Sequence, residues 1–581
     1  MRTDRGGWTD PPGHAEWLAD DPDPATRAEL QRLLDAAAAG DATAQAEIAD
    51  AFRGPLEFGT AGLRGRMGPG PHRMNRVTVS RAAAGIAAYL LARHEHPTAV
   101  IGFDARHNSA RFARDCAEIL EGAGVKALVL PRALPTPLLA YAVRALGADA
   151  GLMVTASHNP AQDNGLKVYL GDGRQIVPPA DAEIAALIAA VGPVAELPRS
   201  DDHETLGDDI VDAYVAQAAQ VPLPHTPRDV VSLHTAMHGV GSAVLQEAAT
   251  RAGFPAPFTV AEQRDPDPEF PTVAFPNPEE AGALDLAMAE GRRINVDVII
   301  ATDPDADRCS LAVGVPRGRP AHADARAPGE WVALSGDEVG WLLGWWLLRR
   351  GELTGSPFTG TMAASLVSST MLQRIAEDAG IPFTTTLTGF KWISRAPDLG
   401  YGYEEALGYC VDPRHVADKD GITAALLALE LVAALNAEGR TVFDVLDELA
   451  LRHGVHATRQ VSLRLPTPEL IASAVDRLRA DPPRDLGGVP VEAIVDLADK
   501  PDRGGLAGPP GHTDGLPPTD GILLRLPDAR VIVRPSGTEP KVKCYLEVVR
   551  RVDGAGLAIT REEADATLDR LAIAVRERLG A

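Results

Sequence analysis

Short apolar stretches and helical segments alternate along most of this chain, and this alternation constrains the fold more than any other feature. A helical run at 80–94 precedes apolar, strand-like stretches at 99–103, 125–130 and 150–155. Strands that alternate with helices are typical of an α/β layer with a largely parallel sheet. We therefore expect an α/β domain here, preceded by a polar-faced helical segment at 15–53.

The same alternation returns twice further along the chain. Strand-like stretches stand at 229–233 and 296–301, and helices are expected after Asp337 and Ser368, with a short strand near 382–386. No repeat of the amino-acid letters accompanies this rhythm. The sequence therefore predicts three similar α/β domains in succession.

The last part of the chain has a different pattern. Most of its apolar stretches are short and strand-like, and the segment 481–520 is rich in Pro and Gly, which indicates a long surface loop. The expected strands lie at 460–465, 522–526, 530–533 and 543–549, with helices at 468–480 and 561–579. We expect a smaller α+β domain, with the four domains at 1–207, 208–325, 326–457 and 458–581.

Charge and hydropathy exclude two classes of partner. The 581 residues include 56 basic and 80 acidic side chains, a formal net charge of -24, so neither nucleic acid nor an anionic membrane surface is an expected partner. The most apolar stretches, 339–348 and 422–435, are shorter than the roughly 18 residues of a membrane span. Both are expected to be buried helices.

The cysteines and the start of the chain bear on the compartment. Residues 1–10 contain no apolar stretch typical of a signal peptide. The four cysteines lie far apart and have neither disulfide nor zinc-ligand spacing; they are Cys116, Cys309, Cys410 and Cys544. We expect a reducing, cytoplasmic environment.

The most specific chemical signal is the segment Ala301-Thr302-Asp303-Pro304-Asp305-Ala306-Asp307-Arg308, directly after an apolar strand. In an extended chain the three carboxylates would share one face, and three hard oxygen donors suit Mg²⁺. An EF-hand is excluded, because Arg308 and Gly314 stand where that motif needs Gly and Glu. A solvated acidic turn is the alternative, and Arg308 is either a salt-bridge partner or a ligand clamp.

A second signal is Thr155-Ala156-Ser157-His158-Asn159-Pro160, again after an apolar strand. Ser157 is a candidate nucleophile or phosphate carrier, although serine before Asn-Pro is commonly a turn or cap residue. A lipase-like nucleophile elbow is disfavoured because Thr155 and Asn159 replace its glycines. Lys167 closes Asn164-Gly165-Leu166-Lys167, which we interpret as a turn presenting a proton donor or an electrostatic clamp, or an exposed lysine.

Two further loops are compatible with a phosphosugar. In Arg534-Pro535-Ser536-Gly537-Thr538-Glu539-Pro540-Lys541, hydroxyls, a guanidinium and a glycine could hold an oxyanion, or the segment is a plain hairpin. In Gly402-Tyr403-Glu404-Glu405-Ala406-Leu407-Gly408, followed by Lys419-Asp420-Gly421, paired carboxylates could accept hydrogen bonds from sugar hydroxyls, or form a solvated loop.

Taken in order, these segments resemble the α-D-phosphohexomutase superfamily, which includes phosphoglucomutases and phosphomannomutases. Phe58-Gly59-Thr60-Ala61-Gly62-Leu63-Arg64-Gly65 comes first, followed by the serine, Asp303, double-Glu and Arg534 loops, so the resemblance spans nearly the whole chain. It implies a heart-shaped molecule of three similar α/β domains and a small C-terminal α+β domain, with one loop of each facing a central cleft.

The resemblance also implies a role for each candidate residue. Ser157 would carry the phosphoryl group, and Asp303, Asp305 and Asp307 would hold Mg²⁺ together with a phosphoryl oxygen on Ser157. Lys167 would be the general acid/base, near Arg64 and His158. The expected sugar contacts are Arg308, Thr388, Gly389, Glu404, Glu405 and Lys419, and the expected clamp on the non-reacting phosphate is Arg534, Ser536, Gly537 and Thr538.

One departure affects the substrate. Many hexomutases carry a serine where this chain has Ala406, so the double-Glu loop lacks one hydroxyl that could contact the sugar. This form, with the segments at 234–241 and 275–280, resembles the branch that includes phosphopentomutases and glucose-1,6-bisphosphate synthases. The resemblance thus implies a glucose or mannose phosphate mutase working through a sugar 1,6-bisphosphate, with a pentose phosphate mutase or a bisphosphate synthase as alternatives.

Two other classes of function share part of this inventory. A Mg²⁺-dependent sugar phosphatase would use the same acidic loop and phosphoenzyme but release inorganic phosphate. A non-catalytic sugar-phosphate sensor would need neither a carrier nor a proton shuttle, so the presence of both Ser157 and Lys167 argues against it.

Overall fold

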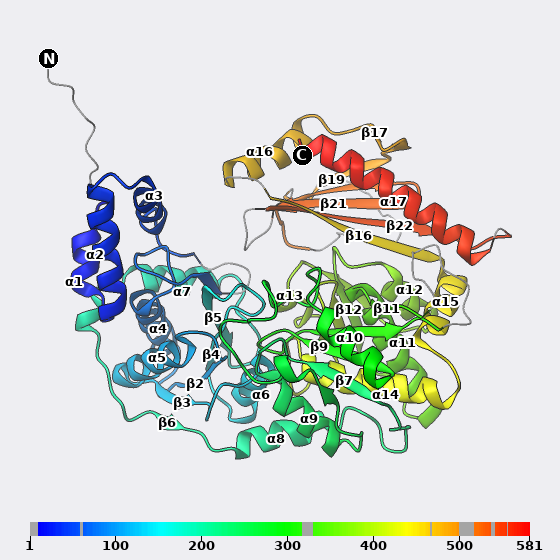
Figure 1. The fold of residues 1–581 in the computed structure, drawn as a ribbon, viewed down its shortest axis with the longest axis horizontal. Helices are drawn as coiled ribbons and strands as arrows, with labels where there is room; N and C mark the ends of the chain where they lie inside the picture. The colour runs from blue at the N-terminus through cyan, green and yellow to red at the C-terminus, as the bar shows by residue number, and fades with distance from the viewer. Residues whose placement is uncertain are drawn as a thin grey trace.

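The structure, a computed structural model, describes residues 10–57, 62–316, 329–464, 468–498, 516–535, 541–554 and 556–580. Four main sheets follow one another along the chain (Figure 1). Three of them carry helices in an α/β arrangement, and the last forms a separate sheet with a long helix over one face.

The N-terminal segment is helical, as expected, and consists of α1 (His14–Asp20), α2 (Pro24–Ala38) and α3 (Ala42–Ala51). The first sheet has the order β1-β5-β4-β2-β3-β6. Its strands are β1 (Leu63–Arg66), β2 (Thr98–Phe103), β3 (Lys126–Val129), β4 (Ala150–Val154), β5 (Asp163–Leu170) and β6 (Glu204–Thr205). Its helices are α4 (Arg76–Leu91), α5 (Ser109–Ala123), α6 (Thr136–Ala145), α7 (Ala180–Ala189) and the short η1 (Val194–Glu196).

The second sheet has the order β11-β10-β9-β7-β8. Its strands are β7 (Ser232–Thr235), β8 (Phe258–Thr259), β9 (Val298–Thr302), β10 (Cys309–Gly314) and β11 (Trp331–Ala333). The helical elements of this part are α8 (Asp209–Ala218), α9 (Gly241–Arg251), η2 (Ala261–Gln263) and α10 (Asp285–Ile294).

The third sheet has the order β13-β12-β14-β15. It is built from β12 (Thr361–Ser365), β13 (Phe383–Thr386), β14 (Leu399–Glu404) and β15 (Gly408–Cys410). The accompanying helices are α11 (Gly336–Thr354), α12 (Met371–Asp378), α13 (Phe390–Ile393), α14 (Gly421–Ala437) and α15 (Val442–His453). As expected, α11 and α14 contain the two most apolar stretches, and the side chains of 421–435 are all buried.

The fourth sheet has the order β16-β22-β21-β20-β19 and all its pairings are antiparallel. Its strands are β16 (Val455–Arg464), β19 (Ala493–Asp496), β20 (Ile522–Leu526), β21 (Ala529–Pro535) and β22 (Lys541–Arg550). A small hairpin of β17 (Asp485–Leu486) and β18 (Val489–Pro490) and the helices α16 (Pro468–Ala480) and α17 (Leu557–Leu579) complete it. The expected surface loop at 481–520 thus contributes strands, and its residues 499–515 lie outside the described part.

The first three sheets share one topology. In each, a central strand pairs in parallel with two neighbours, and one of these neighbours pairs with an antiparallel return strand; the return strands are β5, β10 and β15. The rhythm seen in the sequence is therefore a repeat of topology. The sheets are parallel around their central strands, as expected, and antiparallel at this edge, because a connection of a few residues cannot make the crossover that a parallel strand needs.

That edge is where the candidate loops lie. The serine loop joins β4 to β5, the Asp303 loop joins β9 to β10, and the double-Glu loop joins β14 to β15. The fourth candidate loop stands between β21 and β22. Equivalent loops of successive units are thus placed to meet.

No single helix in the described ranges is both long and apolar enough to cross a membrane. The pair formed by α14 and α15 meets the length and hydropathy criteria only when joined, across a bend of 91°.

Candidate active site

Ser157 stands three residues after β4 in a backbone conformation that non-glycine residues seldom adopt, with φ at 53°. Its N–H donates to Thr155 Oγ1 over 2.8 Å, and its carbonyl accepts from Arg106 Nη2 over 2.6 Å. Arg106 Nη1 also donates to the Pro160 carbonyl over 2.7 Å. These contacts offset the cost of the strained backbone and fix the direction of the serine hydroxyl.

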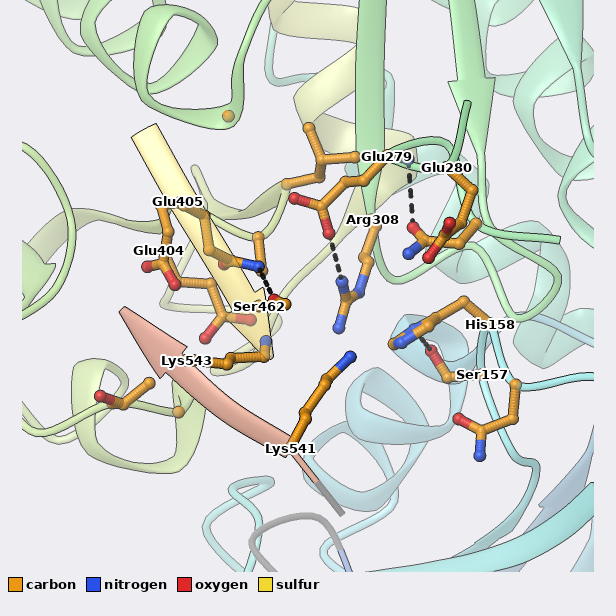
Figure 2. A pocket seen from close by; sticks show the side chains of 18 of the residues that line it. Ser157, His158, Glu279, Glu280, Arg308, Glu404, Glu405, Ser462, Lys541 and Lys543 are labelled. Atoms are coloured by element: carbon orange, nitrogen blue, oxygen red, sulfur yellow. Dashed lines mark hydrogen bonds and ion pairs between the residues drawn. The ribbon is translucent and has the colours of Figure 1, made fainter. Parts of the chain in front are cut away.

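The Ser157 hydroxyl joins the first two domains. Its Oγ donates to Asp303 Oδ2 over 2.7 Å. The same oxygen lies 3.1 Å from His158 Nδ1 (Figure 2). Burial and the charges of Arg308 and Arg64 lower the pKa of His158 well below its usual range, so the ring is neutral. The candidate phosphate carrier therefore lies directly beside the acidic loop.

The three aspartates converge as a group, but not in the extended conformation expected from the sequence. Residues 303–308 form a tight loop in which Ala306 has φ at 52° and its N–H donates to the Asp303 carbonyl. One carboxylate oxygen from each of Asp303, Asp305 and Asp307 lies within 4.8 Å of the others, and all three side chains are buried. The loop, rather than strand alternation, brings them together.

These carboxylates fit a divalent metal ion. Burial and the charges of Asp305 and Asp307 raise the pKa of Asp303 well above its usual range. Asp305 Oδ1 and Asp307 Oδ1 are buried and have no hydrogen-bond partner among the described residues. Buried carboxylate oxygens without partners are costly unless a cation approaches them, and hard oxygen donors are the ligands that Mg²⁺ prefers.

Lys167 lies on the strand β5, not in the turn that its Asn-Gly neighbours indicated. Its Nζ donates to Asp305 Oδ2 over 2.7 Å and to Asp307 Oδ2 over 2.6 Å. Burial acts to lower the pKa of Lys167, but the two carboxylates raise it overall. Thr136 Oγ1, which the sequence did not single out, also donates to Asp305 Oδ2 over 2.6 Å.

Arg64 lies on β1, next to the serine loop. Its Nη1 donates to Asn159 Oδ1 over 3.2 Å. Burial is the main cause of a lowered pKa, and Asp305 and Asp307 are among the charges around the guanidinium. The structure thus groups Arg64 with Ser157, as expected for a contact near a transferring phosphate.

The double-Glu loop and the Asp303 loop touch each other. The Cys309 N–H donates to the Leu407 carbonyl over 3.0 Å, and Lys419 Nζ lies 3.3 Å from Asp307 Oδ2. Glu405 Oε2 accepts from Ser365 and Ser368 Oγ, each over 3.0 Å. The other expected sugar contacts, Arg308, Thr388, Gly389, Glu404 and Glu405, line the same cleft as Lys419.

This cleft has a volume of about 1530 Å³ and is lined by residues of all four domains. Arg534, the described residue of the expected phosphate clamp, lines it; Ser536, Gly537 and Thr538 lie outside the described residues. Lys541 and Lys543 of β22 reach into it from the fourth domain (Figure 2). Arg534, Lys541 and Lys543 thus form a basic end of the cleft in the fourth domain.

Sequence reasoning missed several residues of the site. Arg106 and Thr136 lie in no recognisable motif, because each contacts a site residue far away along the chain: Arg106 contacts Ser157, and Thr136 contacts Asp305. Lys543 stands two residues after the quoted Arg534 segment, so alternation on the expected strand at 543–549 could have found it.

Comparison with known proteins follows the same four parts. Profiles of the phosphoglucomutase/phosphomannomutase family match in order: alpha/beta/alpha domain I at 55–193, domain II at 212–315, domain III at 335–452 and the C-terminal domain at 490–558. Together these ranges cover well over half of the chain.

Whole-chain relatives agree with these profiles. A probable phosphomannomutase of Haemophilus influenzae is 48% identical over 82% of this chain and 93% of the relative. The phosphopentomutase of Homo sapiens is 33% identical over 92% of this chain and 90% of that relative. A solved phosphoglucomutase/phosphomannomutase family protein of Burkholderia thailandensis has the same fold, with a TM-score of 0.65 at 18% identity over 90% of this chain and 97% of that one. The chain therefore belongs to the phosphoglucomutase/phosphomannomutase family.

Proposed function

We propose that this protein is a phosphosugar mutase that interconverts the 1-phosphate and 6-phosphate of a hexose, glucose or mannose, through a phosphorylated Ser157. The contact of Ser157 Oγ with Asp303 Oδ2 at 2.7 Å, inside a cleft shared by four domains, carries this proposal. The 48% identity to a probable phosphomannomutase supports the choice of hexose.

In the reaction, Ser157 donates its phosphoryl group to the free hydroxyl of a sugar monophosphate. The bond from phosphorus to the serine oxygen breaks as a bond to the sugar oxygen forms, and the sugar hydroxyl gives up one proton for the one that the serine oxygen gains. Lys167 carries a proton in the described arrangement and suits the role of proton donor to the serine oxygen, with Arg64 and His158 beside the phosphoryl group. The resulting 1,6-bisphosphate turns over in the cleft and returns its other phosphate to Ser157.

Asp303, Asp305 and Asp307 would hold Mg²⁺. The ion, when bound, neutralises charge on the phosphoryl group. The protein positions these three carboxylates from one loop and holds the Ser157 hydroxyl against Asp303. Phosphoryl transfer would then depend mainly on the orientation of the reacting groups and on the neutralisation of their charge.

The remainder of the cleft would hold the sugar and its second phosphate. Arg308, Thr388, Gly389, Glu404, Glu405 and Lys419 would contact the ring, and Arg534, with Ser536, Gly537 and Thr538, the non-reacting phosphate. A phosphatase needs no second phosphate site, so the basic end formed by Arg534, Lys541 and Lys543 favours a mutase.

A pentose phosphate mutase is the second candidate. The phosphopentomutase relative and Ala406 in the sugar loop favour it, since the lost hydroxyl removes one ring contact. We also propose a reducing, cytoplasmic setting, because all four cysteines are free and buried thiols.

The test replaces Ser157 by Ala. Incubation with labelled glucose 1,6-bisphosphate should label the wild type at Ser157 and leave the variant unlabelled, and mutase turnover should fall by at least about a thousandfold because the acceptor oxygen is gone. Coupled assays with glucose, mannose and ribose 1-phosphate, beside a phosphate-release assay, distinguish the substrates and the phosphatase. Near-normal turnover by purified variant free of other mutases would disprove the carrier role.

A further inference from the structure

The loop at 275–280 contains none of the residues assigned to the reaction above. It lies between β8 and α10 of the second domain, and its residues Phe275, Asn277, Pro278, Glu279 and Glu280 line the cleft. Asn277, which is 9% exposed, organises the turn: its N–H donates to the Phe275 carbonyl over 2.8 Å, and its Oδ1 accepts from the Glu279 N–H over 3.2 Å. The loop is therefore ordered and presents Glu279 in one direction.

That direction is the middle of the cleft. Glu279 Oε2 lies 3.6 Å from Arg308 Nη1, and Figure 2 shows the two side chains pointing toward each other, with Glu280 directed to one side. The Glu279 side chain is 41% exposed and that of Arg308 only 14%. Within the described part of the chain, this ion pair is the closest charged contact of Glu279, so much of its carboxylate faces the cavity.

The middle of the cleft carries the carboxylates of Glu279, Glu404 and Glu405 beside the basic Arg308 and Lys419. Arg64 stands at the Ser157 end, and Lys541 and Lys543 stand at the fourth-domain end. Between them lies Glu279, whose pKa is raised by burial and by the charge of Glu405, against the opposing charges of Arg308 and Lys543. Carboxylates repel phosphates but are strong acceptors for hydroxyl groups, so this middle zone suits the sugar ring rather than either phosphate.

We propose that Glu279 is a further specificity-determining residue, whose carboxylate accepts a hydrogen bond from a ring hydroxyl of the phosphosugar while Arg308 holds its orientation. The inference rests on the proposed function, since it needs a sugar ring between two phosphate sites. It adds a second-domain ring contact beside Arg308 to those from the third domain, where Ala406 has no hydroxyl. The same charge repels sugar phosphates that carry a carboxylate on the ring at this position.

The experiment compares full-length Glu279→Gln with Glu290→Gln, a change of the same kind on α10 of the same domain, where Glu290 pairs with Arg293 outside the cleft. The substrates are glucose 1-phosphate and its monodeoxy analogues. We expect Glu279→Gln to raise KM about tenfold with kcat changed less than about twofold, since a charged acceptor becomes a neutral one, whereas Glu290→Gln stays within about twofold of the wild type in both.

The deoxy analogues identify a direct contact. If Glu279 accepts a hydrogen bond from one hydroxyl, removal of that hydroxyl should cost the wild type about tenfold in kcat/KM and cost Glu279→Gln almost nothing further. Glu279→Asp, which keeps the charge, should recover part of the loss. The assignment would be overturned if the losses from Glu279→Gln and from the missing hydroxyl simply add for every analogue, or if Glu290→Gln causes equal losses.

Two outcomes separate this inference from the function on which it rests. A wild type that isomerises no sugar phosphate would disprove the mutase proposal itself. A fully active wild type with an unchanged Glu279→Gln would leave the mutase standing and remove only the role of Glu279. Thermal unfolding of each variant verifies that the exposed substitution has not altered folding.

Discussion

At the scale of single residues, burial in the cleft changes the chemistry of ordinary carboxylates. Glu404 ends the strand β14, and burial raises its pKa to about 7 even though Lys419 and Arg308 oppose that shift. A raised pKa means that the side chain gains its proton as the pH falls through about 7. The charged form, which is the stronger acceptor for a sugar hydroxyl, exists above that pH.

This shift predicts how activity depends on pH. We expect kcat/KM of the wild type to fall as the pH is lowered from 8 to 6, because Glu404 is protonated over that range. Glu404→Gln should have kcat/KM about tenfold lower at pH 8 and a visibly flatter profile between pH 8 and 6. The substrate phosphate titrates equally with both proteins, so the difference between the profiles reports Glu404; parallel profiles would contradict the prediction.

Residues could be identified from the sequence where their chemistry is visible in a short segment. Ser157 and Asp303 stand in such segments at the ends of apolar strands, and the structure brings them into contact although 146 positions separate them. Thr136 could not be found this way. It reaches Asp305 across 169 positions, and a threonine at the start of a helix is indistinguishable in sequence from an ordinary cap residue.

At the scale of elements, the strand β5 shows why the loop edge of each sheet was only partly predictable. Its Asn164-Gly165 pair is typical of a tight turn. Here the glycine serves a close approach of strands, because a Cβ at Gly165 would lie 2.6 Å from the Thr155 carbonyl oxygen and 2.7 Å from that of Leu63. Sequence spacing alone cannot distinguish a glycine needed for packing from one needed for a turn.

Because β5 is a strand, Lys167 and Tyr169 project from the same face. Lys167 reaches the Asp303 loop, and the Tyr169 hydroxyl donates to Asp418 Oδ2 over 2.7 Å in the third domain. Asp418 Oδ1 in turn accepts from the Lys419 N–H over 2.8 Å. One strand of the first domain therefore supports both the candidate metal loop and the loop that carries Lys419.

We predict that Tyr169→Phe weakens sugar binding more than phosphoryl transfer. The change leaves Gln175 Nε2 as the remaining side-chain donor to Asp418 Oδ2, so the carboxylate is held less firmly. It can then turn toward Lys419 Nζ, now 4.0 Å away, and draw that ammonium from the sugar. We expect KM to rise about tenfold and the free energy of unfolding to fall by about 1–3 kcal/mol. Steady-state kinetics and urea unfolding give the two values.

Tyr214→Phe is the matched control for this prediction. The Tyr214 hydroxyl donates over 2.9 Å to Asp420, on the other side of Lys419, but Asp420 keeps its bonds to the N–H groups of Ile422 and Thr423 at the start of α14. A similar loss of stability with an unchanged KM is expected. Equal effects of the two changes on KM would mean that Tyr169 has no special influence on Lys419.

At the scale of the whole molecule, the cleft is complete only when the fourth domain stays against the third. Glu547 on β22 accepts from Ser369 Oγ over 2.7 Å and from the Thr370 N–H over 2.8 Å, just before α12. Arg530 donates to Glu547 Oε2 over 2.6 Å and to the Leu366 carbonyl over 2.9 Å. Burial acts to raise the pKa of Glu547, but Arg530 and the hydrogen bonds hold it below its usual range, so the carboxylate stays charged.

The same short segment also contacts the sugar loop. Ser368 donates to Glu405 Oε2, and Val367 lines the cleft. The segment 365–370 therefore lies between a candidate sugar contact and the anchor of the fourth domain. A change in the anchor is expected to alter the position of Arg534, which lies on the neighbouring strand β21, relative to Ser157.

We therefore predict that Glu547→Gln loosens the fourth domain without removing the carrier chemistry. A buried charge loses its partner when Arg530 faces a neutral amide, at a cost of up to about 3–5 kcal/mol for the domain contact. The radius of gyration from small-angle scattering should increase, and KM for the sugar phosphate should rise. Labelling of Ser157 by a bisphosphate at saturating concentration should persist, since Ser157 and Asp303 belong to the first two domains.

Asp528→Asn, which alters an exposed pair with Arg550 in the same domain, should change none of these values. A Glu547→Gln protein with unaltered scattering and KM would show that the fourth domain is held by its apolar contacts, such as Leu366 against Ile532, rather than by this buried carboxylate.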